Sequence, residues 1–146
     1  MLALLQRVTQ AQVQVEQQII AEIKFGLLIF LGVEKNDTLL QAEKLAQRVL
    51  NYRIFNDTQH KMNLNVQALS GEILVVPQFT LTADTQSGLR PSFAPSASPK
   101  IAALRYQQFI KTLQQSPLKI AMGQFGANMA VSLTNDGPVT LLLRSH

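Results

Sequence analysis

The sequence contains no cysteine, and histidine occurs only at His60 and His146. A chain without thiols has no disulfide framework, no cysteine nucleophile and no cysteine-based zinc site. Two isolated histidines argue against a metal site and against a Ser-His-Asp triad. We therefore expect no metal and no cofactor, and any hydrolytic chemistry must depend on other groups.

Long apolar runs are also absent. No stretch approaches the roughly 20 apolar residues that cross a membrane, and Met1 to Arg7 lack the charged region and cleavage site of a signal peptide. We expect a cytoplasmic protein with no membrane partner. A chain of 146 residues is usually a single domain, so we predict one domain over residues 1–146.

The charge balance is modestly basic. Thirteen Lys and Arg residues against nine Asp and Glu residues give a net charge of +4. This balance favours a polyanionic partner such as RNA. The basic residues are scattered, however, so the pattern fits a solvated surface as well as an RNA-facing patch.

Apolar alternation predicts β-structure at the start of the chain. Val13 and Val15 alternate with polar residues at the period of a half-buried strand. Gln17-Gln18 is then the expected turn and 19–23 the return strand. The next run, 26–33, is apolar enough for a strand that is buried on both faces.

Capping patterns predict two helices. Thr38 with Gln41 three residues later matches a capping box, and Ser98-Pro99 is an N-cap with proline at the first helical position. The expected core face of the first helix is Ala42, Leu45, Ala46, Val49 and Leu50. That of the second is Ala103, Tyr106, Ile110 and Leu113.

The remaining segments favour short strands and loops. Residues 51–70 are polar and irregular, and 72–81 is a buried strand that Pro77 interrupts at a bulge, a strand end or an edge. The connection 82–99 is long enough to suggest a functional loop. Further strands are expected at 119–122, 128–134 and 139–143. These elements predict an α+β fold: one compact domain with a mostly antiparallel or mixed, barrel-like sheet packed against two main helices.

A rigid Gly137-Pro138 pair separates the last two predicted strands. Glycine tolerates backbone angles that other residues avoid, and proline removes an N–H donor. An X-Pro bond can also be cis, which would point adjacent carbonyl oxygens the same way. An ordinary hairpin turn is the default interpretation, and a binding element made of backbone is the alternative.

Two segments, Pro77-Gln78-Phe79-Thr80 and Gly137-Pro138-Val139-Thr140, resemble signature segments of the D-aminoacyl-tRNA deacylases, also called the D-tyrosyl-tRNA deacylase family. In that family the first reads Ser-Gln-Phe-Thr and the second Gly-Pro-Val-Thr. The resemblance spans the chain, and its other segments are Gln6-Arg7-Val8, Arg53-Ile54-Phe55, Lys61-Met62-Asn63, Arg90-Pro91-Ser92-Phe93 and Gly123-Gln124-Phe125-Gly126-Ala127-Asn128-Met129. So many ordered matches argue against coincidence.

The resemblance implies hydrolysis of the ester that joins a D-amino acid, or glycine, to the 3′-terminal adenosine of tRNA, with L-aminoacyl-tRNA rejected. It also implies a homodimer in which each subunit inserts a cis Gly137-Pro138 pair into the active site of the other. The carbonyl oxygens of Gly137 and Pro138 would then meet the substrate α-ammonium and leave no room for an L side chain.

The resemblance also implies roles for single residues. The implied set is Gln78, Phe79 and Thr80 around the ester and the adenosine, Arg7 as a brace for the incoming Gly-Pro segment, and Phe125 and Met129 as pocket wall. An activated ester needs little beyond oxyanion stabilisation and a positioned water. Backbone N–H groups near Phe79 and Thr80 are the expected oxyanion donors, and the family proposal assigns water activation to the ribose 2′-OH of the tRNA.

Each of these residues also has a structural interpretation. Phe79, Phe125 and Met129 are core residues by default, and Arg7 is a surface arginine with its stem on the sheet. A nucleophilic Thr80 hydroxyl remains an alternative, although the sequence shows no obvious base beside it.

Position 77 departs from the family pattern, because proline there removes a hydroxyl and a backbone N–H. Activity remains the expectation, with a reduced rate or altered positioning left open. Two other functions are also open. One is a tRNA-binding module with impaired catalysis. The other is a hydrolase of free D-amino-acid esters, which would depend little on salt because it makes no phosphate contacts.

Overall fold

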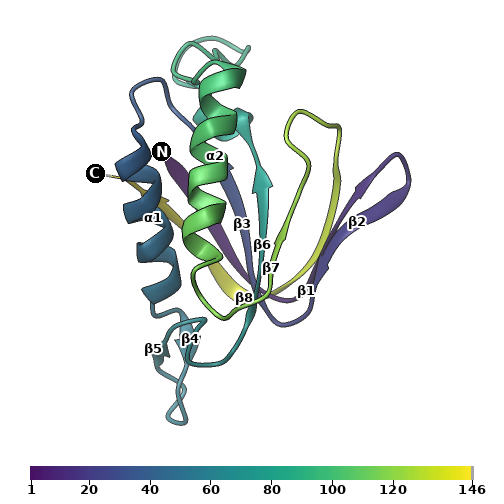
Figure 1. The fold of residues 1–146 in the computed structure, drawn as a ribbon, viewed down its shortest axis with the longest axis vertical. Coiled ribbons are helices and arrows are strands. Elements are labelled where there is room, and N and C mark those ends of the chain that lie inside the picture. The colour runs from purple at the N-terminus through teal and green to yellow at the C-terminus, as the bar shows by residue number, and fades with distance from the viewer. Residues whose placement is uncertain (146) are drawn as a thin grey trace.

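The structure is a computed structural model that describes residues 1–145. A mixed sheet is packed against two α-helices (Figure 1). The elements are β1 (Leu2–Val15), β2 (Gln18–Ile23), β3 (Gly26–Gly32), α1 (Leu39–Asn51), β4 (Phe55–Asn56), β5 (Met62–Leu64), β6 (Glu72–Pro77), the 3₁₀ helix η1 (Phe79–Thr82), α2 (Pro99–Leu113), β7 (Ile120–Met122) and β8 (Ala130–Arg144). The predicted α+β class with a barrel-like sheet and two main helices is confirmed.

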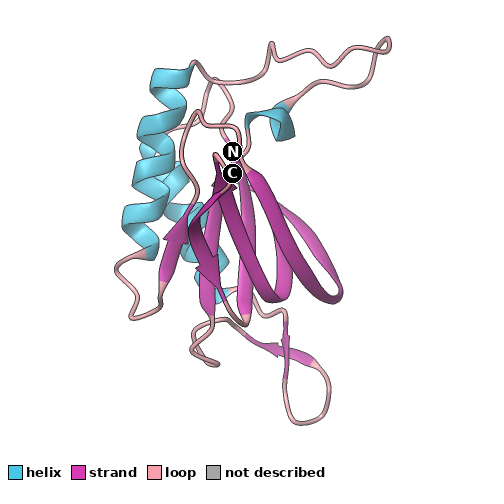
Figure 2. Ribbon diagram, turned by 90° about the vertical axis from the view of Figure 1, so that its right-hand side faces the viewer, coloured by secondary structure: helices cyan, strands magenta, loops and turns pink. Residues whose placement is uncertain are grey.

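The main sheet has six strands in the order β2-β1-β3-β6-β7, and β8 lies along the other edge of β1. Strand β1 runs antiparallel to β2, β3 and β8, whereas β6 runs parallel to β3 and β7. The first half of β1 pairs with β3 and its second half with β2. Because β1 is shared in this way, the sheet curls. Both helices lie against the outer face of the sheet (Figure 2).

Burial on both faces explains the unbroken apolar runs. In β3, Leu27 and Ile29 belong to the core between sheet and helices. Leu28 belongs to a second core inside the curl, together with Leu74 and Val76 of β6. A strand covered on both faces needs no polar alternation.

The predicted helix starts are correct. The Thr38 side chain accepts a hydrogen bond from the Gln41 backbone, and both bonds of the capping box form. All five residues predicted for the core face of α1 are buried. In α2, Ala102 is buried in place of Ala103. Residues 101–104 are all apolar, so the sequence pattern there did not define which of them faces the core.

Other local predictions were wrong as well. The first hairpin turns at Glu16-Gln17, which have φ values of 50° and 66°, as two-residue hairpin turns require. The segment 51–70 contains the small β4–β5 hairpin. The strands predicted separately at 128–134 and 139–143 form one strand, β8, so Gly137-Pro138 is not a hairpin turn. No helix in residues 1–145 is long and apolar enough to cross a membrane.

Candidate active site

A pocket of about 600 Å³ lies where β3 and β6 end. The η1 turn, the start of α2 and the 123–129 loop, which joins β7 to β8, surround it. Its lining brings together four residues that the resemblance implied: Gln78, Phe79, Phe125 and Met129. Thr80 belongs to the same η1 turn as Phe79.

Proline sets the geometry of the η1 turn by ending β6 at residue 77. The Gln78 N–H donates to the Leu31 carbonyl at 2.8 Å, so this N–H is not free for substrate. The chain then enters η1, and the first N–H groups of a helix have no partner within it. No hydrogen bond from another part of residues 1–145 engages the N–H groups of Phe79 and Thr80.

The pocket exposes aromatic rings. The Phe79 side chain is 61% exposed, and its ring centroid lies 5.1 Å from that of Phe93. Phe125 is 38% exposed and lies 6.0 Å from the Tyr106 ring. The core interpretation of Phe79 and Phe125 is therefore wrong, whereas Met129 is half-buried against the inner core. Exposed apolar surface of this kind marks binding sites.

The Thr80 hydroxyl has one polar contact in the described chain: it accepts a hydrogen bond from the Gln78 side-chain amide. The residues that line the pocket between positions 31 and 131 include no carboxylate and no imidazole. A hydroxyl nucleophile needs an adjacent base, and the pocket supplies none to Thr80.

The Gly137-Pro138 peptide is cis, and it lies in a bulge of β8. Strand β8 is antiparallel to β1 on both sides of the bulge, with Gln6 opposite Thr140 and Val8 opposite Asn135. The four residues 136–139 therefore form a bulge opposite a single β1 residue, Arg7. Both Gly137 and Pro138 are exposed.

Side chains of the same subunit hold this bulge. Arg7 is only 7% exposed, so it is not the surface arginine of the structural interpretation. Its Nε contacts the Asp136 carbonyl at 3.1 Å and the Asp136 carboxylate at 3.0 Å, and its Nη1 donates to the Ile54 carbonyl at 2.8 Å. The Asn135 amide donates to the Val139 carbonyl at 3.0 Å. Contacts within one chain thus brace the bulge.

The two predicted parts of the site do not meet within one chain. Val131 of β8 lines the pocket, and Gly137 follows six residues later on the same strand. A strand advances about 3.3 Å per residue, which puts roughly 20 Å between them. The pocket lies beside the start of β8, and the bulge lies at its middle.

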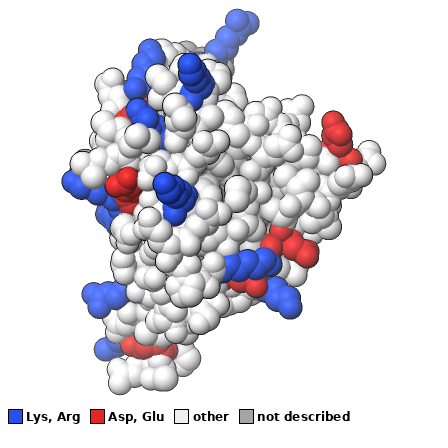
Figure 3. All heavy atoms as spheres, in the orientation of Figure 1, with Lys and Arg blue, Asp and Glu red and all other residues white. Residues whose placement is uncertain are grey.

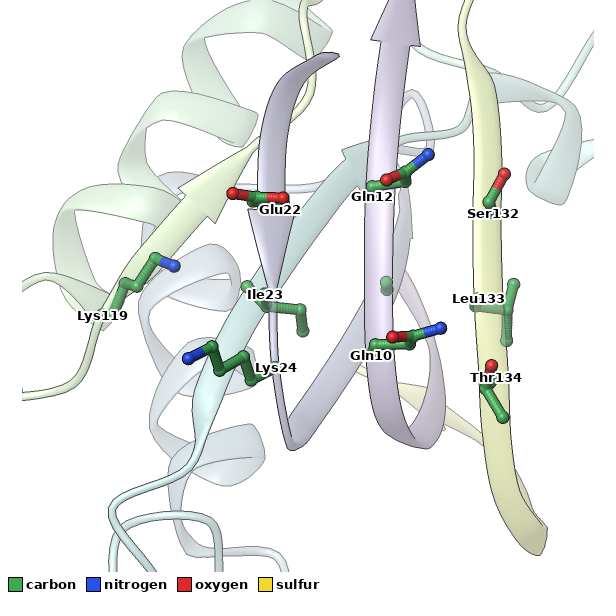
Figure 4. Close-up of a pocket in the computed structure, with 10 residues that line it drawn as sticks. Gln10, Gln12, Glu22, Ile23, Lys24, Lys119, Ser132, Leu133 and Thr134 are labelled. Atoms are coloured by element: carbon green, nitrogen blue, oxygen red, sulfur yellow. The ribbon is translucent and has the colours of Figure 1, made fainter.

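A second hollow of about 510 Å³ lies along β1 and β2. Figure 4 shows Gln10 and Gln12 of β1 beside Ser132 and Thr134 of β8, with Lys119 on the far side of β2. None of the implied site residues lines this hollow. We therefore centre the candidate active site on the first pocket.

The sequence did not indicate three groups that contact the pocket or the bulge: the Phe93 ring, the Asn135 amide and the Tyr106 hydroxyl. Phe93 lies inside a segment that had already been singled out and Asn135 lies two residues before another, so their neighbours were the available signal. Tyr106 was predicted as core, which is correct. An apolar pattern carries no information about where its hydroxyl points.

Comparisons with known proteins agree with this geometry. The sequence model of the family described as D-Tyr-tRNA(Tyr) deacylase matches residues 4–144. The D-aminoacyl-tRNA deacylase of Histophilus somni is 57% identical over 98% of this chain and 99% of its own length. That of Photorhabdus laumondii is 54% identical over 99% of both chains.

Solved structures show the same architecture. The c-Myc DNA Unwinding Element Binding Protein matches with a TM-score of 0.94 and 36% identity, over 100% of this chain and 99% of its own. A probable eukaryotic D-amino acid tRNA deacylase matches with a TM-score of 0.83 at 15% identity, over 97% of each chain, which shows a shared fold. The family model and the curated relatives define an enzyme of the deacylase class. The chain belongs to the D-Tyr-tRNA(Tyr) deacylase family.

Proposed function

We propose that the chain, as a deacylase of this family, hydrolyses the ester between a D-amino acid, or glycine, and the 3′-terminal adenosine of tRNA, and rejects the L-aminoacyl ester. The observation that carries the proposal is the pair of unengaged N–H groups at Phe79 and Thr80 beside exposed aromatic rings. Such donors can stabilise an oxyanion, and the rings provide a surface for a base.

The chemistry requires little from side chains. A water oxygen bonds to the ester carbonyl carbon, and the carbonyl oxygen becomes an oxyanion that the two N–H groups stabilise. The bond from carbon to the ribose 3′ oxygen then breaks, and that oxygen takes a proton. Because the pocket lining has no carboxylate or imidazole, the ribose 2′-OH of the substrate is the group that assists the water.

The Phe79–Phe93 pair is suited to the terminal adenine. Proteins recognise unpaired RNA bases by stacking them on aromatic side chains. The two rings come from η1 and from the 82–99 connection. A hydrogen bond of 2.5 Å between the Thr82 and Ser96 hydroxyls links these segments. The long connection thus contributes a wall to the nucleotide site.

Chirality is assigned to the Gly137-Pro138 bulge of the partner subunit in a homodimer. The bulge is exposed and braced, and it lies too far along β8 to serve its own pocket. A two-fold axis would exchange the bulges between two pockets. Carbonyl oxygens of the partner's bulge would hold the substrate α-ammonium, and the backbone would exclude an L side chain by steric clash.

The tRNA end beyond the adenosine would meet a basic rim. Lys35 is exposed, and its N–H bonds to Pro95 beside the pocket-lining Ser96. Lys100 is exposed and follows Pro99, which also lines the pocket. On the face that carries both helices, blue Lys and Arg side chains outnumber red Asp and Glu side chains (Figure 3). Contacts of Lys and Arg with phosphates would give affinity without base specificity.

Matched D- and L-tyrosyl-tRNA test the activity directly. The D-ester should be hydrolysed much faster than the L-ester, and free D-tyrosine esters should be poor substrates. Equal rates on the two tRNAs would contradict chiral rejection.

Mixed dimers test the cross-subunit arrangement. Phe79→Pro removes one oxyanion donor at a first helical position, which tolerates proline, and Gly137→Ala damages the bulge. Each variant alone should have little activity. Refolding the two together in equal amounts should restore about a quarter of the wild-type sites, because half of the dimers are mixed and each has one intact site. If mixed dimers form and no activity is gained, the bulge of one subunit does not serve the pocket of the other.

A further inference from the structure

We propose that Tyr106 is a positioning residue: its hydroxyl holds the Gly123 carbonyl where Pro77 leaves the β6–β7 ladder without a donor, and so fixes the pocket loop 123–129. The link to catalysis rests on the proposed function. The hydrogen bonding can be tested without it.

The missing donor follows from the register of β6 and β7. The Ile73 N–H donates to the Lys119 carbonyl at 2.9 Å, and the Gly123 N–H donates to the Val75 carbonyl at 2.8 Å. Bonds in a parallel ladder repeat every two residues, so the next one would run from the N–H of residue 77 to the Gly123 carbonyl. Proline has no N–H, and this bond cannot form.

The Tyr106 hydroxyl reaches the same place from α2. It lies 3.0 Å from the Val75 carbonyl oxygen and 3.4 Å from the Gly123 carbonyl oxygen. The Val75 carbonyl already accepts the Gly123 N–H. Within residues 1–145, the Tyr106 hydroxyl is the one group that donates a hydrogen bond to the Gly123 carbonyl. Burial raises the pKa of the Tyr106 hydroxyl, which therefore keeps its proton.

Gly123 is the point at which the pocket loop leaves the sheet. A Cβ atom at Gly123 would lie 2.8 Å from the Met129 sulfur and 3.3 Å from Pro77 Cδ, so the loop packs tightly there. The Tyr106 ring also contacts Phe125 at a centroid distance of 6.0 Å. Releasing the Gly123 carbonyl would thus move both predicted wall residues, Phe125 and Met129.

The test compares wild type, Tyr106→Phe, Pro77→Ala and the double variant. Tyr106→Phe keeps the ring but should lower kcat/KM on D-tyrosyl-tRNA about tenfold, which corresponds to ~1.4 kcal/mol, and should lower the thermal midpoint. Pro77→Ala restores an N–H at position 77. The kcat/KM of the double variant should therefore lie within about twofold of that of Pro77→Ala alone. Such non-additivity is expected when two groups donate to the same partner, here the Gly123 carbonyl.

Thr112→Val is the matched control, because it removes another buried hydroxyl of α2, one that bonds to the Gln108 carbonyl at 3.0 Å. Pro77→Ala should not rescue it. If Tyr106→Phe does not fold, the double variant should fold. Additive losses, or equal rescue of Thr112→Val, would overturn the proposal. A wild type without D-specific activity would contradict the proposed function alone, because the four thermal midpoints would still report the hydrogen bond.

Discussion

The pocket beside the start of β8 and the bulge at the middle of the same strand are built in opposite ways. At the pocket end, aromatic rings are exposed and two backbone N–H groups of η1 have no partner within residues 1–145. At the bulge, Arg7 and Asn135 bond to backbone carbonyls and so hold the segment in place. The pocket thus leaves its binding groups unsatisfied, whereas the bulge is already organised.

This difference suits the proposed site, which is shared between two subunits. A pocket that binds an ester must leave donors free for it, because stabilisation of a developing charge depends on preorganised groups that no other partner occupies. A steric filter must instead be rigid, because it rejects the wrong enantiomer only if the backbone does not shift to relieve the clash. In the proposed dimer, one chain would supply the ester pocket beside the start of its β8 and, from the middle of that strand, the steric filter for the partner's pocket.

Gly137→Ala should break the bulge and have the largest effect. A Cβ atom there would lie 2.2 Å from the Asn135 side-chain oxygen, and Asn135 cannot yield without losing its bond to the Val139 carbonyl. We expect hydrolysis of D-tyrosyl-tRNA to fall tenfold or more, since about 1.4 kcal/mol of misplacement costs a factor of ten. Activity on L-tyrosyl-tRNA should not appear. Single-turnover rates on the two tRNAs measure both.

Gly88→Ala is the control for adding a methyl group, because no atom lies within 4 Å of the corresponding Cβ position. It should keep most of the activity, although its φ of +71° makes it slightly destabilising. If Gly137→Ala keeps the wild-type rate and the wild-type preference for D- over L-tyrosyl-tRNA, the bulge does not contact the substrate.

The fold was largely predictable because its elements have local causes. The Thr38 capping box and the apolar face of α1 arise from residues within one helix. The course of the chain at Gly137-Pro138 was not predictable in this way. Whether such a pair reverses a strand or bulges from it depends on pairing with β1, more than 120 residues earlier in the sequence.

The candidate site was predictable only through family resemblance. Gln78 and Phe125 come from elements that meet only when the sheet forms. The buried state of Arg7 depends on Ile54 and Asp136, which are 47 and 129 residues away in sequence. The resemblance grouped Phe79 with Gly137, but only the structure separates them within one subunit.

Thr80→Ala sharpens the comparison at the pocket end and should have a smaller effect. The hydroxyl contacts the Gln78 side chain and no base, so its removal leaves both proposed oxyanion donors in place. We expect a loss of no more than about fivefold in kcat, the size of a modest change in positioning. A folded Thr80→Ala protein that binds substrate but shows no turnover would instead identify the hydroxyl as the nucleophile.

Lys100→Ala should have the smallest effect, and one confined to binding. Lys100 lies beside the pocket at the start of α2, whereas Lys111 is exposed on the same helix eleven residues further on, roughly 16 Å away at 1.5 Å per residue. If the tRNA end passes over the pocket rim, Lys100→Ala removes one phosphate contact and should raise KM about threefold. The slope of log KM against the logarithm of salt concentration should also become shallower by about one. Lys111→Ala should change neither quantity, so the pair separates a located contact from the general positive charge of the protein. Equal effects of the two substitutions, measured as KM across a salt series, would mean that the basic surface attracts tRNA without a defined path to the pocket.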